Sequence, residues 1–279
     1  MKLIELSNPF VAPIYHIDET TSTMDEARKL AETSLHGTVV VADYQHAGRG
    51  RAAGRQWHAA PGESLLCTLI LCYPRFQDMP AALPLRLGVA AALTLEELWP
   101  ILAGRVAVKW PNDVLIDGKK VCGILCEAEG QHVYAGIGLN LLQREFPPEI
   151  SHRSISVLQA IESLDRVSAA QGETRGNRAA LDAATAAPDA PDRYRLLINL
   201  LEHIKAILEN NVPLWLDELN KRLYKRGATV RFLSGSADEP VPVLGTVEGV
   251  APTGELLIRR ADSDKAASFI TGELDVYGA

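Results

Sequence analysis

Short apolar runs alternate with polar segments through the first half of the chain. β-Branched and other apolar residues gathered over such short runs indicate strands. These runs lie at residues 14–18, 38–43, 64–73, 106–109, 114–116, 119–129 and 133–141. Apolar residues recur at helical spacing over residues 83–99. The pattern therefore predicts a sheet with one amphipathic helix packed against it.

The second half has a different pattern. Residues 168–192 contain nine alanines and no aromatic residue, which predicts a flexible or weakly helical insertion. Residues 193–210 and 214–224 carry apolar positions at helical spacing. Turn residues then separate short strand patterns, which favour a small barrel. These strand patterns cover residues 229–233, 241–250, 255–260 and 266–276.

A helix start follows the first strand. Thr23 with Glu26 three residues later matches a capping box, which predicts a helix from there to residue 33. Ser22 and Thr23 then have two interpretations. They are either caps alone or polar groups at a helix N-terminus, where free N–H groups can hold a polar ligand.

Residues 44–57 read Tyr-Gln-His-Ala-Gly-Arg-Gly-Arg-Ala-Ala-Gly-Arg-Gln-Trp. Glycine gives this segment conformational freedom, so it is expected to be a mobile loop able to close around a ligand. Arginine offers a planar set of donors matched to carboxylate or phosphate. A solvated basic loop is the alternative, since the phosphate-loop signature ending in Gly-Lys-Ser/Thr is absent from the sequence.

Two further segments carry polar groups at strand ends. A strand ends in Lys109-Trp-Pro-Asn-Asp113, where a buried lysine requires a negative partner and proline fixes the turn. Another ends in Gly136-Ile-Gly-Leu-Asn140. Its glycines allow a ligand to approach the backbone closely, and the side-chain amide of Asn140 can form hydrogen bonds with the edge of a ring.

Composition narrows the possible ligands. The chain has 279 residues, 47% of them apolar, and a net charge of −7, so it can bury one large core or two. The arginine loop is thus a local positive site on an acidic protein, which favours a small anion over a long nucleic acid. Four cysteines without Cys-x-x-Cys spacing indicate buried reduced thiols rather than a zinc site. Without a signal peptide or an apolar run of membrane-spanning length, we expect a soluble, cytoplasmic protein with no membrane partner.

The segments together resemble the biotin–protein ligases, also called biotin–acetyl-CoA-carboxylase ligases or holocarboxylase synthetases. The resemblance covers residues 14–142, where the motifs occur in the family's order and spacing. It rests on Ser22-Thr23, Gln45 with Gly48-Arg-Gly-Arg51 and Gly54-Arg-Gln-Trp57, Lys109-Trp-Pro-Asn-Asp113, Lys120-Val-Cys-Gly-Ile-Leu-Cys-Glu127 and Gly136-Ile-Gly-Leu-Asn140.

This resemblance implies an α+β fold: a mixed or antiparallel sheet packed by helices, as in class II synthetases, with a small C-terminal SH3-like barrel. The implied domains are residues 1–227, catalytic, and 228–279, SH3-like. The implied reaction joins biotin and ATP, with Mg²⁺, into biotinyl-5′-adenylate. Biotin then passes to one lysine of a carboxylase acceptor domain. All residues implied in ligand chemistry fall within 14–142, so the C-terminal strands favour a packing or docking unit over a second active site. They are either a structural cap or, as the resemblance implies, a domain that helps bind ATP or position the acceptor.

The resemblance also implies roles for single residues. Ser22, Thr23 and Gln45 would bond the biotin head group. Arg49 and Arg51 would hold the carboxylate and phosphate, and Lys109 would neutralise charge between them, so these three are the expected catalytic residues. The other implied biotin contacts are Met24, Gly50, Trp57, Gly123 and Gly138. The implied adenylate contacts are Arg51, Arg55, Trp57, Lys109, Asn112 and Asn140, with Asn140 facing the adenine.

Two departures from the family concern the biotin contacts. Met24 stands where the family often has asparagine, and Ala52-Ala53 stands where one residue is usual. About 13 residues precede the first predicted strand, too few for the DNA-binding domain of the family's repressors. We therefore expect a ligase that does not bind DNA. A homodimer is a separate expectation for this protein.

Two other interpretations are open. A lipoate–protein ligase, or a related acyl transferase, shares the catalytic fold, but its usual Arg-Arg-x-x-Gly-Gly-Gly motif is absent from the sequence. An RNA-binding module would combine the arginine loop with a small barrel. It would call for interleaved aromatic residues, and the loop has only Tyr44 and Trp57 at its ends.

Overall fold

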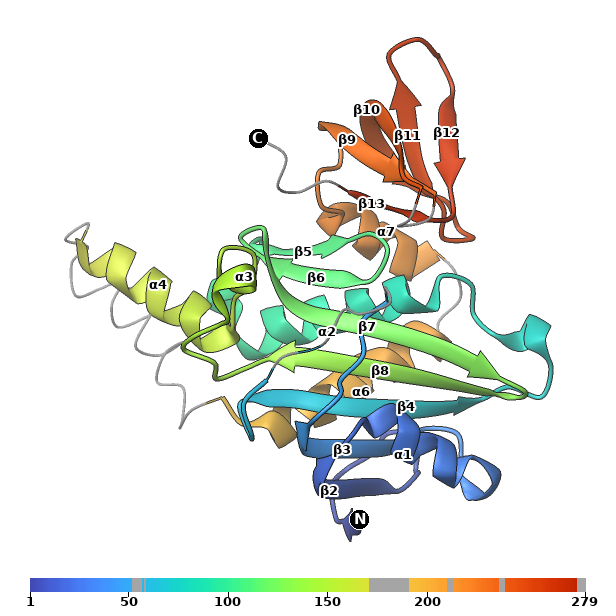
Figure 1. Cartoon of the computed structure of the whole chain (residues 1–279), viewed down its shortest axis with the longest axis vertical. Helices are drawn as coiled ribbons and strands as arrows, with labels where there is room; N and C mark the ends of the chain where they lie inside the picture. The colour runs from blue at the N-terminus through green and yellow to red at the C-terminus, as the bar shows by residue number, and fades with distance from the viewer. Residues whose placement is uncertain (52–56, 58, 171–190, 210–212, 236–238, 275–279) are drawn as a thin grey trace.

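A large mixed sheet forms the body of the protein (Figure 1). The computed structural model describes residues 1–51, 57, 59–170, 191–209, 213–235 and 239–274. Within these, eight strands pair in the order β1-β2-β3-β4-β8-β7-β6-β5. The strands are β1 (Lys2–Ile4), β2 (Ile14–Thr20), β3 (Thr38–Gln45), β4 (Ser64–Cys72), β5 (Val106–Lys109), β6 (Asp113–Ile116), β7 (Lys119–Glu129) and β8 (His132–Asn140).

Among the described pairs of this sheet, only β2 and β3 run parallel. The α+β fold with a mixed sheet is thus confirmed. Strand β1 was not predicted, because three residues with Leu3 exposed carry no strand pattern of their own. It forms by pairing with β2.

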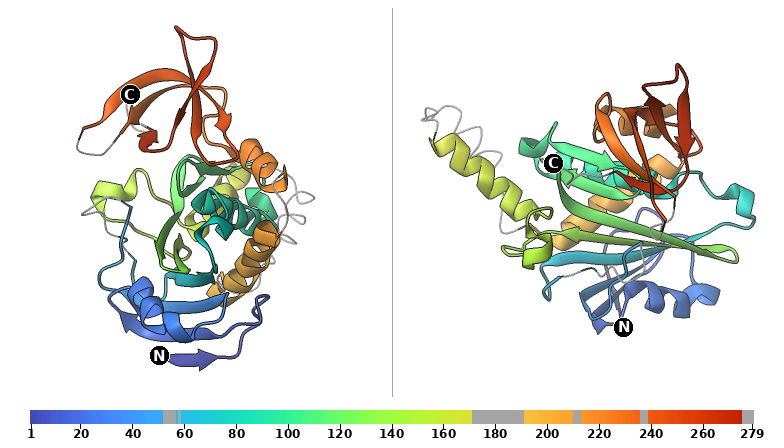
Figure 2. Two further views of the ribbon diagram at one scale, coloured as in Figure 1. Left: turned by 90° about the vertical axis from the view of Figure 1, so that its right-hand side faces the viewer. Right: turned by 45° about the horizontal axis from the view of Figure 1, so that its top comes forward.

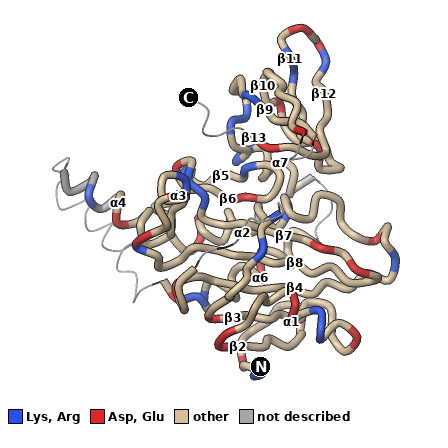
Figure 3. Tube along the Cα trace, in the orientation of Figure 1, with Lys and Arg blue, Asp and Glu red and all other residues tan. Residues whose placement is uncertain are grey.

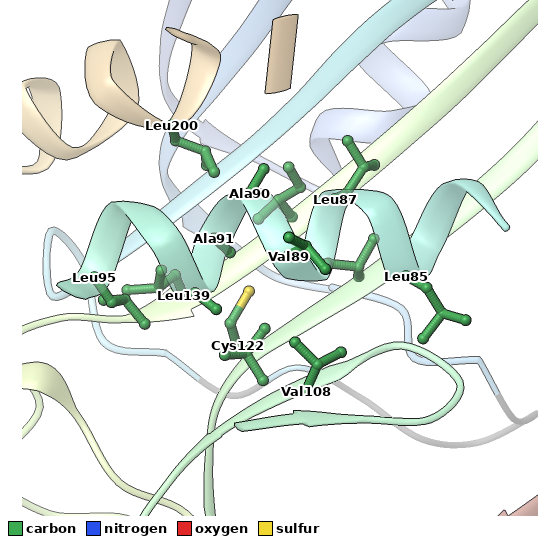
Figure 4. Close-up of a cluster of buried hydrophobic side chains, with 14 of the residues drawn as sticks. Leu85, Leu87, Val89, Ala90, Ala91, Leu95, Val108, Cys122, Leu139 and Leu200 are labelled. Atoms are coloured by element: carbon green, nitrogen blue, oxygen red, sulfur yellow. The ribbon is translucent and has the colours of Figure 1, made fainter. Parts of the chain in front are cut away.

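Helices cover the two faces of the sheet unequally (Figures 1 and 2). The large apolar cluster on one face contains α2 (Leu83–Leu98) and α6 (Arg193–Glu209). Helix α2 packs directly on the strands, through the side chains shown in Figure 4. Gly88 allows this approach, since a Cβ there would lie 3.2 Å from Val108 Cγ1. The opposite face carries α1 (Thr23–Leu30), whose Met24 and Ala27 pack with Val40 in a smaller cluster.

The start of α1 corrects the predicted capping box. The N-cap residue is Ser22, whose Oγ accepts from Met24 N. Glu26 does not reach back to the cap; it accepts from Thr20 Oγ1 and from Lys29 instead. Thr23 is therefore the first helical residue, and its side chain is available for other contacts. The helix proper ends at Leu30, and a 3₁₀ turn continues it over Ala31–Thr33.

Residues Phe76–Leu98 are long and apolar enough to cross a membrane, contrary to the prediction from the sequence. Within the most apolar window of this segment, 61% is buried inside the protein. Helix α2 lies in that segment and belongs to the main core. Its apolar character is therefore explained by burial between the sheet and α6.

The connection from the sheet to α6 contains helices that the sequence pattern did not indicate. Helices α3 (Pro148–Ser151) and α4 (Val157–Ala170) follow β8. Helix α4 projects from the sheet in both figures and includes residues 168–170 of the predicted insertion. The rest of that insertion, apart from residues 191–192, lies outside the described residues. Helix α7 (Pro213–Arg222) comes after α6.

The C-terminal strands form a second, antiparallel sheet above β5 and β6 in Figure 1. Within the described residues its order is β12-β11-β10-β9-β13, without pairing between the two outer strands, so an SH3-like barrel stays a prediction. Its strands are β9 (Thr229–Ser234), β10 (Val241–Val250), β11 (Leu256–Arg260), β12 (Ala266–Phe269) and β13 (Gly272–Leu274).

The two sheets share one apolar core. Phe232 and Ile258 of the second sheet belong to the same buried cluster as the first. Trp110, which is 2% exposed, packs edge-on against Phe232 with ring centroids 5.8 Å apart. Its Nε1 donates to the carbonyl of Gly254 at 2.9 Å. The second sheet is therefore fixed to the first by both apolar packing and a buried hydrogen bond.

We expect Trp110→Phe to lower the free energy of unfolding by about 1–2 kcal/mol beyond the effect of ring size, because it removes the donor to Gly254 O. The control is Trp99→Phe, since the Trp99 side chain is also largely buried but donates no hydrogen bond within the described residues. Urea denaturation measures both. Equal losses would show that the Trp110 bond contributes nothing to stability.

Candidate active site

A cavity opens on the face of the sheet opposite α2, between the start of α1 and the strands β4, β7 and β8. Ten of the eleven residues predicted to bind biotin line it. These are Ser22, Thr23, Met24, Gln45, Arg49, Gly50, Arg51, Trp57, Gly123 and Gly138. The fold thus brings residues from distant parts of the chain into one wall, and their roles toward a ligand stay predictions.

Polar groups at one end of this cavity are held by one another. The Gln45 side-chain oxygen accepts from Thr23 N at 2.7 Å and from Thr23 Oγ1 at 3.1 Å. Thr23 Oγ1 also lies 2.8 Å from Thr68 Oγ1 on β4. Because Thr23 N is one of the free donors of a helix start, Gln45 satisfies a group that would otherwise require water. This end of the cavity is therefore preorganised for a polar ligand.

The floor of the cavity is made of glycine. A Cβ on Gly138 would lie 2.7 Å from Cε2 of Trp57, and one on Gly123 would lie 3.0 Å from its Cζ3. The indole can rest on the sheet only because both positions lack a side chain. Trp57 Nε1 is buried and has no hydrogen-bond partner within the described residues. Met24 lies over Gly136 in the same way, since a Cβ on Gly136 would lie 2.9 Å from Met24 Cε.

A second cavity adjoins the first on the side of β5 and β6. It contains Lys109, Asn112 and Asn140 from the predicted adenylate set, together with Asp113. Lys109 is 7% exposed at the end of β5, and it lines this cavity but not the first. Five residues line both cavities: Gly50, Arg51, Trp57, Asn112 and Lys120.

Lys120 lies at this junction. Its Nζ is 2.7 Å from Asp113 Oδ1 and 5.7 Å from the ring centroid of Trp57. Nζ would also be 3.0 Å from a Cβ on Gly123. Lys120 is therefore a cation beside both cavities, held by a carboxylate and by the indole.

The arginine loop contributes two further cations. Arg49 donates to Asp25 Oδ1 of α1 at 2.7 Å, and Arg51 donates to the carbonyl of Gly272 at 3.1 Å. Ala52, Ala53 and Arg55 lie outside the described residues. Basic and acidic residues are interspersed along the trace elsewhere (Figure 3), so the two arginines and Lys120 form a local group of cations around the cavities.

Comparison with known proteins identifies the family of the chain. Residues 14–140 match the Biotin/lipoate A/B protein ligase family. The Biotin--[acetyl-CoA-carboxylase] ligase of Mycobacterium tuberculosis is 30% identical over 240 residues, which cover 83% of this chain and 77% of that protein. The chain belongs to the biotin/lipoate A/B protein ligase family.

Two other family members are informative. The bifunctional ligase/repressor BirA of Bacillus subtilis is 39% identical over 168 residues, 57% of this chain. The chain spans about half the length of the bifunctional relatives from two Bacillus species, 50% and 49%. The biotin protein ligase from Aquifex aeolicus, solved in complex with biotin and ATP, is 27% identical. It superimposes with a TM-score of 0.69 over 94% of this chain and 97% of its own.

Two polar residues of the first cavity, Lys120 and Thr68, were given no role from the sequence. Lys120 stood inside a motif that supported the family resemblance, but Lys109 was preferred because it ends a strand. The available signal was a pair of lysines, Lys119 and Lys120, at the start of a strand. Thr68 is a polar residue inside the apolar strand β4, and alternation would have placed it on the face opposite Cys67 and Leu69.

No residue of the C-terminal strands was assigned to ligand chemistry from the sequence, yet two of them lie at the cavities. Glu273 of β13 lines the second cavity, and Gly272 O accepts from Arg51. The core shared by the two sheets places β13 there. The C-terminal sheet is therefore part of the wall around the candidate site.

Cysteine chemistry does not fit this site. Cys67 lines the first cavity, but burial raises the pKa of its thiol to about 12, so the thiol stays protonated at neutral pH. All four cysteines are free. Among the described residues, the group that could hold a metal is His16, Asp18 and Asp43, away from both cavities. The Arg193 guanidinium already contacts Asp43 there, 2.5 Å from its Oδ1, which disfavours a cation.

We expect Gln45→Leu to lower the free energy of unfolding by about 1–3 kcal/mol, because it leaves the N–H of the buried Thr23 without its acceptor. The control is Gln131→Leu in the exposed turn between β7 and β8, where the effect should stay within about 0.5 kcal/mol. Chemical denaturation measures both. Equal effects would mean that Gln45 does not stabilise the helix start.

Proposed function

We propose that this protein activates biotin with ATP and transfers it to a lysine of a biotin-acceptor domain. The observation that carries the proposal is the pair of adjoining cavities that share Lys120 and Arg51. The proposal is supported by relatives named as biotin--[acetyl-CoA-carboxylase] ligases, and by the Aquifex aeolicus ligase solved with biotin and ATP. The first cavity would receive biotin and the second would receive ATP. The biotin carboxylate and the α-phosphate would then meet where the two cavities join.

Biotin fits the first cavity by its chemistry. Its ureido head group needs hydrogen-bond partners, and Ser22, Thr23 and Gln45 offer them at one end. Its sulfur-containing ring needs an apolar surface, which Met24 and the Trp57 indole offer where they lie over the glycines of the sheet. The carboxylate at the other end of its chain would then lie toward Lys120 and Arg51.

The nucleotide fits the second cavity. Asn140 would face the adenine, while Lys109 and Arg51 would face the phosphates. Mg²⁺ in MgATP binds largely through phosphate oxygens with one or two protein carboxylates. Glu273 lines this cavity and would be the carboxylate that holds the ion, because Asp113 is already paired with Lys120. The ion would neutralise phosphate charge.

The reaction requires two anions to meet. A biotin carboxylate oxygen forms a bond to the α-phosphorus, and the bond from that phosphorus to the pyrophosphate oxygen breaks. Lys120 and Arg51 offset the repulsion as charge moves to the leaving pyrophosphate. In the second step the acceptor lysine amine attacks the biotinyl carbonyl carbon, AMP leaves with the electron pair of the broken bond, and the amine loses a proton.

For the C-terminal strands we propose the SH3-like fold and the domain boundary near residue 228. Five short antiparallel strands after α7 support this, as does the superposition over 97% of the Aquifex aeolicus chain. With β13 at the second cavity, this domain would help to enclose the nucleotide and would present a surface beside the junction to the acceptor protein.

Lipoate is the competing substrate, because the matched family includes lipoate ligases. Exchange of labelled pyrophosphate into ATP measures adenylate formation for each acid separately. We expect biotin to stimulate exchange strongly, and lipoate and octanoate to give little above background. Stimulation by lipoate or octanoate without biotin activity would overturn the proposal.

We expect Lys120→Met to reduce the rate of adenylate formation by on the order of 10²–10³, because it removes a preorganised charge at the junction. Lys109→Met should raise the KM for ATP with little change in the KM for biotin, since Lys109 lines only the second cavity. Lys119→Met is the control, an exposed neighbour that lines neither cavity.

Steady-state kinetics and a circular dichroism spectrum of each variant make the comparison. Normal turnover in folded Lys120→Met, with turnover lost in Lys109→Met, would reverse the two assignments.

A further inference from the structure

A network of buried polar side chains lies directly behind the wall of the second cavity. Asn140 is 4% exposed and lines the cavity. Gln143 and Ser64 are 2% and 0% exposed and line neither cavity. Gln143 Nε2 donates to Asn140 Oδ1 at 3.2 Å and also to Ser64 Oγ. Polar groups buried this deeply are expected to be fixed by their partners.

Two backbone carbonyls determine which way the Asn140 amide points. Asn140 Nδ2 lies 3.2 Å from the carbonyl of Ile155 and 3.5 Å from that of Lys120. A carbonyl only accepts hydrogen bonds, so the nitrogen must face these two groups and Oδ1 must face Gln143. Both amide hydrogens of Asn140 are thereby directed to the backbone.

The orientation of Gln143 follows from that of Asn140. Reversing the Gln143 amide would place its oxygen against Asn140 Oδ1, with no hydrogen between them. The observed orientation instead leaves Gln143 Oε1 buried and without a partner within the described residues. Leaving a buried acceptor unpaired destabilises the folded protein. That the amide keeps this orientation despite the cost indicates that donation to Asn140 decides it.

The segment carrying Gln143 is fixed at its backbone too. Ser156 Oγ donates to Gln143 O at 2.6 Å, and Gln159 Nε2 donates to Arg144 O at 2.8 Å. Ser156 and Gln159 also cap the start of α4 through reciprocal side-chain bonds of 3.1 and 3.2 Å. The start of α4 therefore holds the segment in place, while Gln143 alone connects it to the side chain of Asn140 by a described hydrogen bond.

We propose that Gln143 is a positioning residue that holds Oδ1 of Asn140 in place, so that Asn140, oriented by the two carbonyls, presents only an acceptor to the nucleotide base. With both hydrogens of Nδ2 on the backbone and one lone pair of Oδ1 on Gln143, the second lone pair of Oδ1 remains for a ligand. It accepts from the 6-amino group of adenine and repels the 6-oxo group of hypoxanthine or guanine. The inference rests on the proposed function, because it takes the second cavity as the nucleotide site.

The test compares ATP with inosine triphosphate, a 6-oxo nucleotide, in biotin-dependent pyrophosphate exchange. The variant is Gln143→Met, which keeps the length of the side chain and removes its donor. The matched control is Gln159→Met, which loosens the same segment and the cap of α4 but does not touch Asn140. Thermal unfolding of each variant reports stability separately.

We expect the preference of Gln143→Met for ATP over inosine triphosphate to fall about tenfold through a higher KM for ATP, because Asn140 Oδ1 then loses the donor that holds it in place for the 6-amino group. The KM for biotin should stay within about twofold, since no contact of the first cavity changes. Gln159→Met should lose stability but keep the wild-type nucleotide preference. If Gln143→Met does not fold, Ser64→Ala, which removes one partner of Gln143 Nε2, should shift the preference in the same direction.

An unchanged preference in a folded Gln143→Met, or equal shifts in the two glutamine variants, would overturn the positioning role. Failure of the proposed function is a different result: the wild-type protein would then show no biotin-dependent exchange with either nucleotide.

Discussion

The candidate site depends on the alternation of side chains along β4, β7 and β8. In a strand, successive side chains point to opposite faces, so one sequence must satisfy two environments. Leu139, Ile124 and Leu65 point to the core face and pack beneath α2. Gly138, Gly123 and Thr68 point to the other face and line the first cavity. A shift of one residue in the pairing of these strands would exchange the two faces and abolish both the core and the cavity.

The core and the site therefore constrain each other. The glycines that make room for Trp57 weaken the strands locally, since glycine loses much conformational freedom on folding. The strands tolerate this because their other face is buried against α2 and α6, where apolar burial is the largest favourable contribution. The C-terminal sheet joins the same core and brings Gly272 and Glu273 to the second cavity.

The junction of the two cavities is a local positive site on an acidic protein. The chain carries a net charge of −7, yet Lys120 and Arg51 stand together where two anionic substrates would meet. Each has a partner in this structure, Asp113 for Lys120 and the Gly272 carbonyl for Arg51. Such partners fix a cation in position before the ligand arrives, which lowers the reorganisation needed during reaction.

The sequence was sufficient for features that depend on neighbouring residues. Strand and helix patterns predicted most of the large sheet and α2, and motif order grouped the residues that line the first cavity. Features that depend on distant partners were missed. Strand β1 exists only because β2 pairs with it, and the junction role of Lys120 and the place of Glu273 arise from tertiary packing. The cap at Ser22 differs by one residue from the prediction, since two adjacent hydroxyl residues compete for it.

If the two cavities form one site in which biotin and ATP meet, a single molecule that combines both substrates should occupy both cavities. A non-hydrolysable biotinyl-adenylate analogue is such a molecule, and calorimetric titration measures its binding. We expect one molecule bound per chain, far tighter than biotin, and displaced by biotin and by ATP when each is added alone. Displacement by only one of them, or binding of two molecules per chain, would contradict it.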